Sequence, residues 1–290
     1  MTQKKVALGI LVILLIAVMA VGLYVSYWGL IPRHDYDLTP PEFPGLNEAA
    51  TDGAPPTVLI FNKTNGFIHH DAIPAANKAL TQIAKSKGFQ VFSTMNGAVH
   101  NFEQLRQFDL LIWNNVSGDV LTEDQRQAFK GWMKEGGRWL GIHASGGDLE
   151  YEWDWYVKEF LGAQFIGHTM HPQFTDASLN KVNLESAITR HLPETWIVPQ
   201  EEWYAFDQNP ADSGFQVLIT ADETTYNTAP TPWLNFVASM EGTHPLVWMK
   251  QVDTGRMLYT SIGHQAATYE IPEYKVLLGS AMDWLMETEK

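Results

Sequence analysis

The chain has 290 residues, of which 45% are hydrophobic and 18% are charged, and this composition excludes a wholly disordered protein. Its 33 acidic and 19 basic residues give a formal net charge of −14, which argues against a general nucleic-acid-binding protein because such proteins need basic surface. The absence of cysteine excludes disulfide scaffolds, cysteine-ligated metal sites and cysteine nucleophiles.

Residues 1–32 are predicted to form a membrane segment. Lys4 and Lys5 precede an uncharged, mostly apolar run from Val6 to Pro32, which is long enough to span a bilayer as a helix. Because lysine and arginine gather on the cytoplasmic side of such helices, the body is expected outside the cytoplasm, in a periplasmic or extracellular position. A cleaved signal sequence ending near Ala20 is the alternative, although the apolar run continues well past that residue.

Residues 33–56 are rich in proline and are predicted to be an extended linker. From residue 57 to 290, apolar strand-like runs alternate with amphipathic helical segments, which predicts an α/β fold. We expect a flavodoxin-like, mostly parallel sheet with helices on both faces. Trp113 and Trp139 lie within predicted strands and should be buried. The predicted strands are 57–62, 89–93, 108–113, 138–143, 215–220, 246–250 and 256–261, and the predicted helices are 72–87, 101–106, 122–135, 151–160 and 271–286.

Polar segments follow several of these strands, where the sites of open α/β sheets form. Ordinary turn formation explains most of their Gly, Asn, Asp and Ser residues. It does not explain His69 and His143, which follow the first and fourth strands. The segment from Gly141 to Ser145 has the pattern of a nucleophile elbow with His143 in the nucleophile's place, where an imidazole is a general base, a metal ligand or a polar anchor.

The second half is less regular but also contains histidines. His168 and His171 are three residues apart and are candidates to ligate one metal from a turn. His143 and His264 are further candidate ligands, so a divalent metal such as zinc is one option for a cofactor.

A set of short motifs resembles the trehalose-utilisation, or ThuA-like, family over residues 57–284. They are Thr64–His69, Ser117–Leu121, Gly136–Ala144, Trp153–Tyr156, Glu202–Phe206, His244–Trp248 and Tyr259–His264. The resemblance implies a class I glutamine amidotransferase-like fold and the processing of disaccharides or keto-sugars. Glutamine hydrolysis is not implied, because the amidotransferase cysteine is absent. Ile68 and Glu201 depart from the arginine and aspartate that are common at these positions of the family.

Two classes of function follow. The first is a sugar-processing enzyme, an isomerase, lyase or hydrolase; the second is a non-catalytic carbohydrate- or partner-binding module displayed outside the cytoplasm. The expected partners are a small sugar and the membrane, without nucleic acid, and a homo-oligomer remains an option. The candidate catalytic residues, expected to share one pocket, are His69, His143, Glu202 and His264. The candidate substrate-binding residues are Asn65, Asp119, His168, Trp203 and Tyr204.

Overall fold

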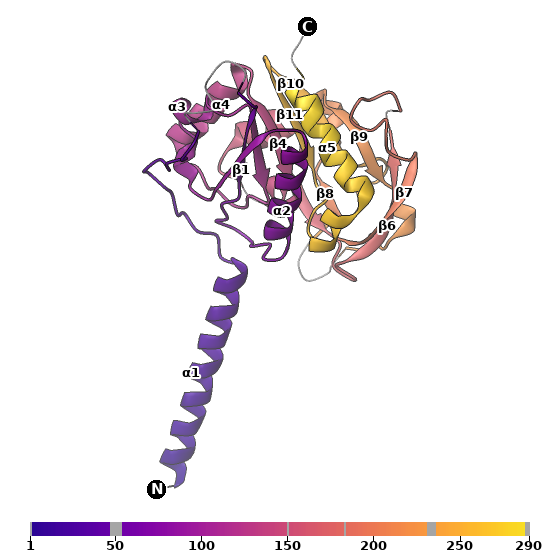
Figure 1. The fold of residues 1–290 in the computed structure, drawn as a ribbon. Helices are drawn as coiled ribbons and strands as arrows, with labels where there is room; N and C mark the ends of the chain where they lie inside the picture. Colours follow the sequence, from indigo (N-terminus) through magenta and orange to yellow (C-terminus); the bar gives the residue numbers. More distant parts are fainter. Residues whose placement is uncertain (1, 47–53, 150, 183, 231–235, 288–290) are drawn as a thin grey trace.

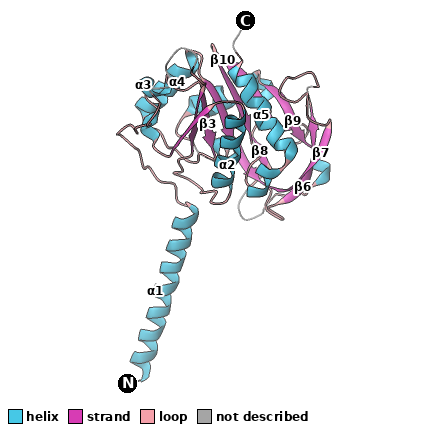
Figure 2. Cartoon of the chain, in the orientation of Figure 1, coloured by secondary structure: helices cyan, strands magenta, loops and turns pink. Residues whose placement is uncertain are grey.

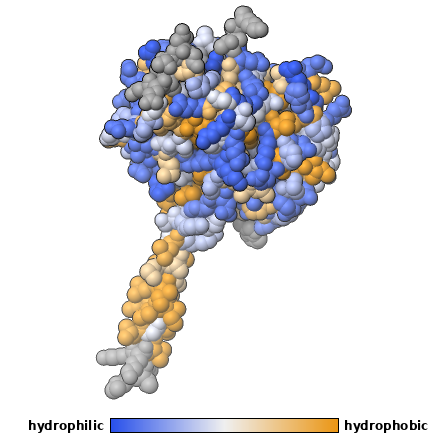
Figure 3. All heavy atoms as spheres, in the orientation of Figure 1, coloured by the Kyte–Doolittle hydropathy of each residue, from blue (hydrophilic) through white to orange (hydrophobic). Residues whose placement is uncertain are grey.

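A computed structural model describes residues 2–46, 54–149, 151–182, 184–230 and 236–287 (Figure 1). Helix α1, Thr2–Trp28, projects from the body as a single rod, and the C-terminus lies on the opposite side of the body (Figure 1). Its segment Val6–Trp28 is long and apolar enough to cross a membrane, by length and composition. Figure 3 shows this apolar rod next to a mostly hydrophilic body.

The body is built on a nine-stranded sheet with the order β2-β1-β3-β4-β11-β10-β9-β6-β7. Within it β10 and β6 run opposite to the other strands, so the sheet is mostly parallel, as predicted. A separate antiparallel pair joins β5 to β8. The strands are β1 Thr57–Phe61, β2 Gln90–Thr94, β3 Leu110–Asn114, β4 Arg138–Ile142, β5 Phe165–His168, β6 Thr175–Lys181, β7 Thr195–Glu201, β8 Tyr204–Phe206, β9 Gln216–Ala221, β10 His244–Val252 and β11 Gly255–Thr260.

Helices cover both faces of the sheet, as the alternation predicted (Figure 2). The α-helices of the body are α2 Ala72–Ser86, α3 Phe102–Leu105, α4 Glu123–Lys134 and α5 Pro272–Met286, and short 3-10 helices η2 His143–Gly146 and η6 Ala266–Glu270 lie near the strand ends. Alternate strand residues enter two cores, since Val58 and Ile60 pack with α2 and α5 whereas Leu59 and Phe61 pack with α3 and α4. Trp113 and Trp139 are buried in the second core, which confirms that prediction.

The predicted helix over 151–160 is wrong in both length and type. The chain becomes helical only at Asp154, and Tyr156–Leu161 form a π-helix that Gly162 ends with a φ of 82°. Trp155 stacks on Phe160 with 5.1 Å between ring centroids. The packing of large aromatic rings, rather than a simple apolar stripe, therefore accompanies the wider winding of this segment.

The segment predicted to be a linker is extended, but residues 33–46 pack on the body. Asp37 forms an ion pair with buried Lys63, at 2.8 Å, and accepts a hydrogen bond from the backbone N–H of Gly97. Leu46 is buried. Specific polar contacts thus fix a segment that its prolines keep out of regular structure, while residues 47–53 lie outside the described part of the chain.

Candidate functional site

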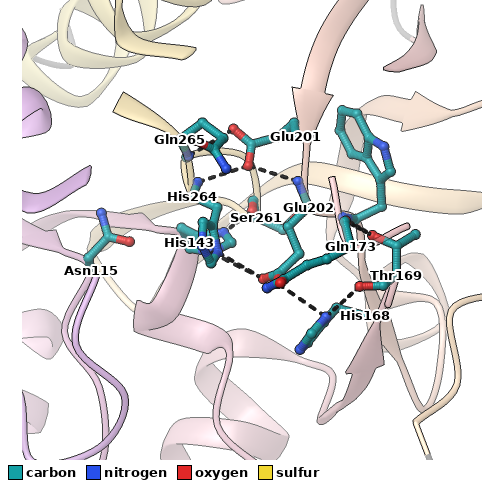
Figure 4. A network of polar contacts seen from close by, with 12 residues as sticks. Asn115, His143, His168, Thr169, Gln173, Glu201, Glu202, Ser261, His264 and Gln265 are labelled. Carbon is teal, nitrogen blue, oxygen red and sulfur yellow. Dashed lines mark hydrogen bonds and ion pairs between the residues drawn. The ribbon is translucent and has the colours of Figure 1, made fainter. Parts of the chain in front are cut away.

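His69, His143, Glu202 and His264 converge near the carboxyl ends of the parallel strands. Figure 4 shows three of them, His143, Glu202 and His264, close together. His69, His143 and His264 follow β1, β4 and β11, while Glu202 follows β7. One ligand atom from each of the four lies within 4.8 Å of the others. The expected convergence is therefore present, and the chemical roles of these residues remain predictions.

The side chain of His143 has a defined orientation and tautomer. Its Nδ1 lies 2.6 Å from the carbonyl oxygen of Ser261. Because a carbonyl only accepts hydrogen bonds, Nδ1 carries the proton and Nε2 keeps its lone pair. That Nε2 lies 3.3 Å from Nδ1 of His264 and 3.6 Å from Oε2 of Glu202. This hydrogen-bonding pattern is the one metal-ligating histidines usually show.

Glu202 is held by a different set of contacts at each oxygen. Its Oε2 lies 3.1 Å from Nδ1 of His264, on the side of the histidine cluster. Its Oε1 accepts a hydrogen bond of 2.7 Å from the side chain of Gln173 and lies 3.1 Å from Nδ1 of His168. Oε2 thus faces the histidine cluster, while Oε1 is held by Gln173 and His168.

Glu201, the last residue of β7, fixes the neighbouring backbone. Its carboxylate accepts hydrogen bonds from the backbone N–H groups of Glu202 and His264, at 2.9 and 3.0 Å, and from the hydroxyl of Thr268 in η6. The far edge of the sheet is therefore tied to the loop after β11, although β7 and β11 are not neighbours in the sheet.

Burial and mutual charge set the ionisation of the cluster. Burial, reinforced by His264, lowers the pKa of His143 to about 3, and burial with His143 lowers the pKa of His69 well below its usual value. Burial would raise the pKa of Glu202, but His264 and His168 outweigh it and the pKa is lowered. Burial would also lower the pKa of His264, but Glu202 reverses this and raises it. The cluster therefore combines two imidazoles that burial keeps neutral, those of His69 and His143, with a carboxylate whose charge favours the protonated form of His264. Such groups bind metals and transfer protons.

The donor set fits a divalent metal. Among the described residues, Nδ1 of His69 is a buried polar atom without a hydrogen-bond partner. Such an orphan nitrogen is costly unless something binds it. Three imidazoles and one carboxylate are ligands that zinc accepts. His168 stays outside the four-ligand cluster, and exposed His171 does not join it, so the predicted pairing of His168 with His171 around one metal is not formed.

A pocket of about 600 Å³ opens beside the cluster. Of the predicted substrate-binding residues, Asp119, His168 and Tyr204 line it, and the Tyr204 ring stacks on His143 with 4.2 Å between centroids. Asp119 also forms an ion pair with Arg126 at 2.8 Å. The pocket is therefore polar near the cluster and has an aromatic wall suited to a sugar ring.

Two predicted substrate-binding residues do not line this pocket. Trp203 is fully buried, and its indole N–H donates to the carbonyl of Thr175, because the side chain points into the core while the next residue points into the pocket. The side-chain amide of Asn65 donates to the carbonyls of Asp35 and Asp119. Both residues therefore support the fold rather than face the pocket.

Other lining residues were missed by the sequence analysis. Gln173 precedes β6, which the sequence did not predict, and the segment Gly29–His34 was assigned to the anchor and linker. The aromatic residues Phe67, Phe165 and Phe236 also line the pocket. No spacing signal identifies them, because tertiary packing alone brings them there.

These features define an α/β domain with a histidine-rich pocket at the carboxyl edge of its sheet. The family model for trehalose utilisation, ThuA, matches residues 57–285, and the chain belongs to that family. The fold resembles a ThuA-like protein from Bacteroides uniformis, with a TM-score of 0.68 and 24% identity over 84% of this chain and 95% of that one. A ThuA-like protein from Parabacteroides merdae matches with a TM-score of 0.57 and 16% identity over 80% and 90% of the two chains.

A cytoplasmic protein from Salmonella typhimurium has a TM-score of 0.52 and 11% identity over 80% of this chain and 100% of that one. A comparison with curated proteins found no match. At these identities the solved structures show the fold, which is the one that the family resemblance predicted.

Proposed function

We propose that this chain is a membrane-anchored enzyme that acts on sugars, with a divalent metal such as zinc held by His69, His143, His264 and Glu202. The observation that carries the proposal is the cluster itself, whose four ligand atoms come from four separate loops and lie within 4.8 Å of one another. The sugar class follows from membership of the trehalose-utilisation family. The anchor follows from the apolar helix Val6–Trp28.

A bound divalent metal would act as a Lewis acid toward a carbonyl oxygen of a keto-sugar. The chain would supply the base. Nδ1 of His168 lies 2.7 Å from the carbonyl of Thr169, so this nitrogen carries a proton and Nε2 keeps the lone pair. We assign to that Nε2 the removal of the acidic proton on the carbon beside the sugar carbonyl. Delivery of that proton to the former carbonyl carbon, with transfer of the neighbouring hydroxyl proton to the former carbonyl oxygen, would complete an isomerisation. Departure of the oxygen substituent on the next carbon, which takes the proton from His168, would instead complete an elimination.

Zinc content and affinity test the metal assignment. The full chain, dialysed against zinc and measured by atomic spectroscopy, should hold about one zinc per chain, because the four ligand atoms are close enough to share one ion. His143→Ala should weaken zinc binding by more than about 10-fold because a ligand is lost. His171→Ala is the matched control, since this histidine is exposed and outside the cluster. Equal zinc binding by all three proteins would contradict the assignment.

Turnover of 3-keto-trehalose, followed by mass spectrometry and NMR, tests the enzyme assignment. We expect conversion by the full chain and a loss of conversion in His168→Ala with zinc content retained. Binding of trehalose or its keto form without any conversion would instead identify a carbohydrate-binding module.

A further inference from the structure

The segment after α1 forms one wall of the pocket. Gly29, Leu30, Pro32, Arg33 and His34 line it on one side, and Glu202, Tyr204 and His264 are among the residues on the other. The ThuA family match begins at residue 57. This wall is therefore an addition of this chain to the family domain.

Backbone hydrogen bonds hold the wall against the loop that carries His69. The backbone N–H of Ile68 donates to the carbonyl of Trp28 at 3.0 Å, and that of Arg33 donates to the carbonyl of Asn65 at 2.7 Å. The ring of Trp28 stacks on Phe67 with 5.6 Å between centroids. The end of α1 and the pocket are therefore parts of one packed unit.

Gly29 is required for this close approach. Its φ is 62°, and a Cβ atom there would lie 2.2 Å from the carbonyl oxygen of Gly66. Gly22, inside α1, has nothing within 4 Å of the corresponding position. Gly22 therefore serves as the control for Gly29, because an added methyl group there neither meets the body nor occupies a left-handed backbone position.

The length of α1 sets the position of the pocket relative to a membrane. Its apolar segment Val6–Trp28 has 23 residues, or about 34 Å of helix, which is slightly longer than the hydrocarbon core of a bilayer, about 30 Å thick, and crosses that core with a small tilt. The aromatic residues Tyr24, Tyr27 and Trp28 close this segment, as is typical of a membrane interface. The pocket wall begins at the next residue, so the pocket lies at the level of the lipid headgroups.

The rim of the pocket is apolar as well. Leu30 and Leu149 line the pocket, yet 48% and 49% of their surfaces are exposed, and Phe236 lies on the same lining. A soluble sugar carries no hydrocarbon chain that would cover such a rim. A sugar with an attached hydrocarbon chain does cover it, with its polar ring inside and its chain passing the rim.

The charge of the pocket favours a neutral sugar. Asp148 and Glu152 line it, together with Asp119, which is paired with Arg126, and Glu202, which belongs to the cluster; Arg33 is the arginine among its lining residues. A phosphorylated or sulfated headgroup would meet this excess of carboxylates.

We propose that the pocket opens at the membrane surface and takes the neutral sugar headgroup of a glycolipid in the same membrane. This inference rests on the proposed function in its two parts, the anchor and the sugar site.

The position of the pocket relative to the membrane is tested first, with single cysteines introduced into a chain that has none of its own. Leu149→Cys places a fluorophore at the rim. Lys85→Cys places one in the last turn of α2, whose 15 residues carry the chain about 22 Å away from the loop of His69. In nanodiscs, brominated phosphatidylcholine should quench the label at residue 149 and spare the label at residue 85. Equal quenching, or none at residue 149, would overturn the inference.

Binding is tested with the unlabelled full chain in nanodiscs. Monoglucosyl diacylglycerol in phosphatidylcholine should raise Tm relative to diacylglycerol alone, because a ligand of the folded state stabilises it. Methyl glucoside in solution should give a much smaller shift. Gly29→Ala should lose most of the glycolipid shift while keeping its zinc, and Gly22→Ala should keep both.

The outcomes separate the two proposals. Equal shifts with methyl glucoside and the glycolipid would overturn the glycolipid inference and leave the sugar site standing. A full glycolipid shift in Gly29→Ala would show that the wall takes no part in binding, which also overturns the inference. No shift with either compound would overturn the sugar site and, with it, the inference.

Discussion

At His143, the backbone conformation and a single hydrogen bond together decide which nitrogen faces His264 and Glu202. The residue has a φ of 48°, in a region that costs a non-glycine residue about 1–2 kcal/mol. The carbonyl of Ser261 accepts a hydrogen bond from Nδ1, and the ring of Tyr204 stacks on that of His143. Surrounding contacts thus maintain a strained conformation at the point where the candidate chemistry takes place, a pattern found at many functional sites.

Gln173 should matter for metal affinity although it is not a ligand. Its side-chain amide donates to Oε1 of Glu202 and so orients the other oxygen toward the histidines. Gln173→Ala should weaken zinc binding about 10-fold, the lower end of the usual effect of losing such a support. Gln127→Ala is the control, because Gln127 is exposed on α4 and bonds only to Glu123 there. An unchanged zinc affinity, measured by competition with a chelator dye, would show that Glu202 needs no such orientation.

The sequence predicts two cluster residues for a physical reason, because His69 and His143 follow parallel strands, whose ends meet at one edge of a sheet. Glu202 and His264 were predicted from the motifs that resemble the family. The role of Gln173 and the orientation of His168 depend on how β6 and β7 curl back toward η6, through contacts such as that of Glu201 with Thr268. Those contacts join residues far apart in the chain and leave no local pattern.

Among the strands, those in the first half of the body have a clear sequence pattern, and several in the second half do not. The strands β1, β3 and β4 are buried on both faces and appear in the sequence as continuous apolar runs. The strand β7 was not predicted, because it lies at the sheet edge, alternates exposed and buried residues and contains Pro199. Proline is tolerated at an edge, where its missing N–H has no ladder partner to lose.

Trp139 in β4 should be among the most costly residues to truncate. It is fully buried, its ring lies 5.0 Å from that of Phe160, and a Cβ on Gly141 would lie 2.0 Å from it. Trp139→Ala should lower the free energy of unfolding by about 3–5 kcal/mol, since it leaves a large cavity. Ile197→Ala on the exposed face of β7 should stay within about 0.5 kcal/mol. Urea unfolding measures both, and similar small losses would mean that β4 is not packed as described.

The whole molecule should lose stability in mild acid because of buried neutral histidines. Burial is the main cause that lowers the pKa of His69, His100 and His143, to about 3 for the last two. Below about pH 6.5 these histidines bind protons in the unfolded chain but stay unprotonated in the folded chain. The free energy of unfolding therefore falls as the pH falls. With three such histidines, the free energy of unfolding should fall by about 4 kcal/mol per pH unit near pH 5.5. The raised pKa of His264 adds stability that is already complete at that pH.

Urea unfolding at pH 7, 6 and 5.5 measures this dependence. His100→Gln is the informative variant, because His100 lies outside the cluster and its Nε2 accepts a hydrogen bond from Trp113. This substitution should reduce the slope by about one third, since one of three titrating groups is removed. A stability that stays constant between pH 7 and 5.5 would mean that these histidines are not buried as neutral groups.

The orientation of the whole chain in a membrane follows from where its charges lie around α1. Lys4 and Lys5 precede the apolar segment and Arg33 is the first basic residue after it, so the lysines favour a cytoplasmic N-terminus. Helix α5 ends on the side of the body opposite α1, so a reporter fused after it lies away from the membrane segment (Figure 1). Alkaline phosphatase fused after Lys290 should therefore be active, and a fluorescent protein that folds only in the cytoplasm should stay dark. Moving both lysines to positions after Trp28 should reverse the two signals, because the positive charges that favour the cytoplasm then lie on the C-terminal side of the apolar segment. Fluorescence from the unaltered chain would place the body, and with it the pocket wall at Gly29, on the cytoplasmic face.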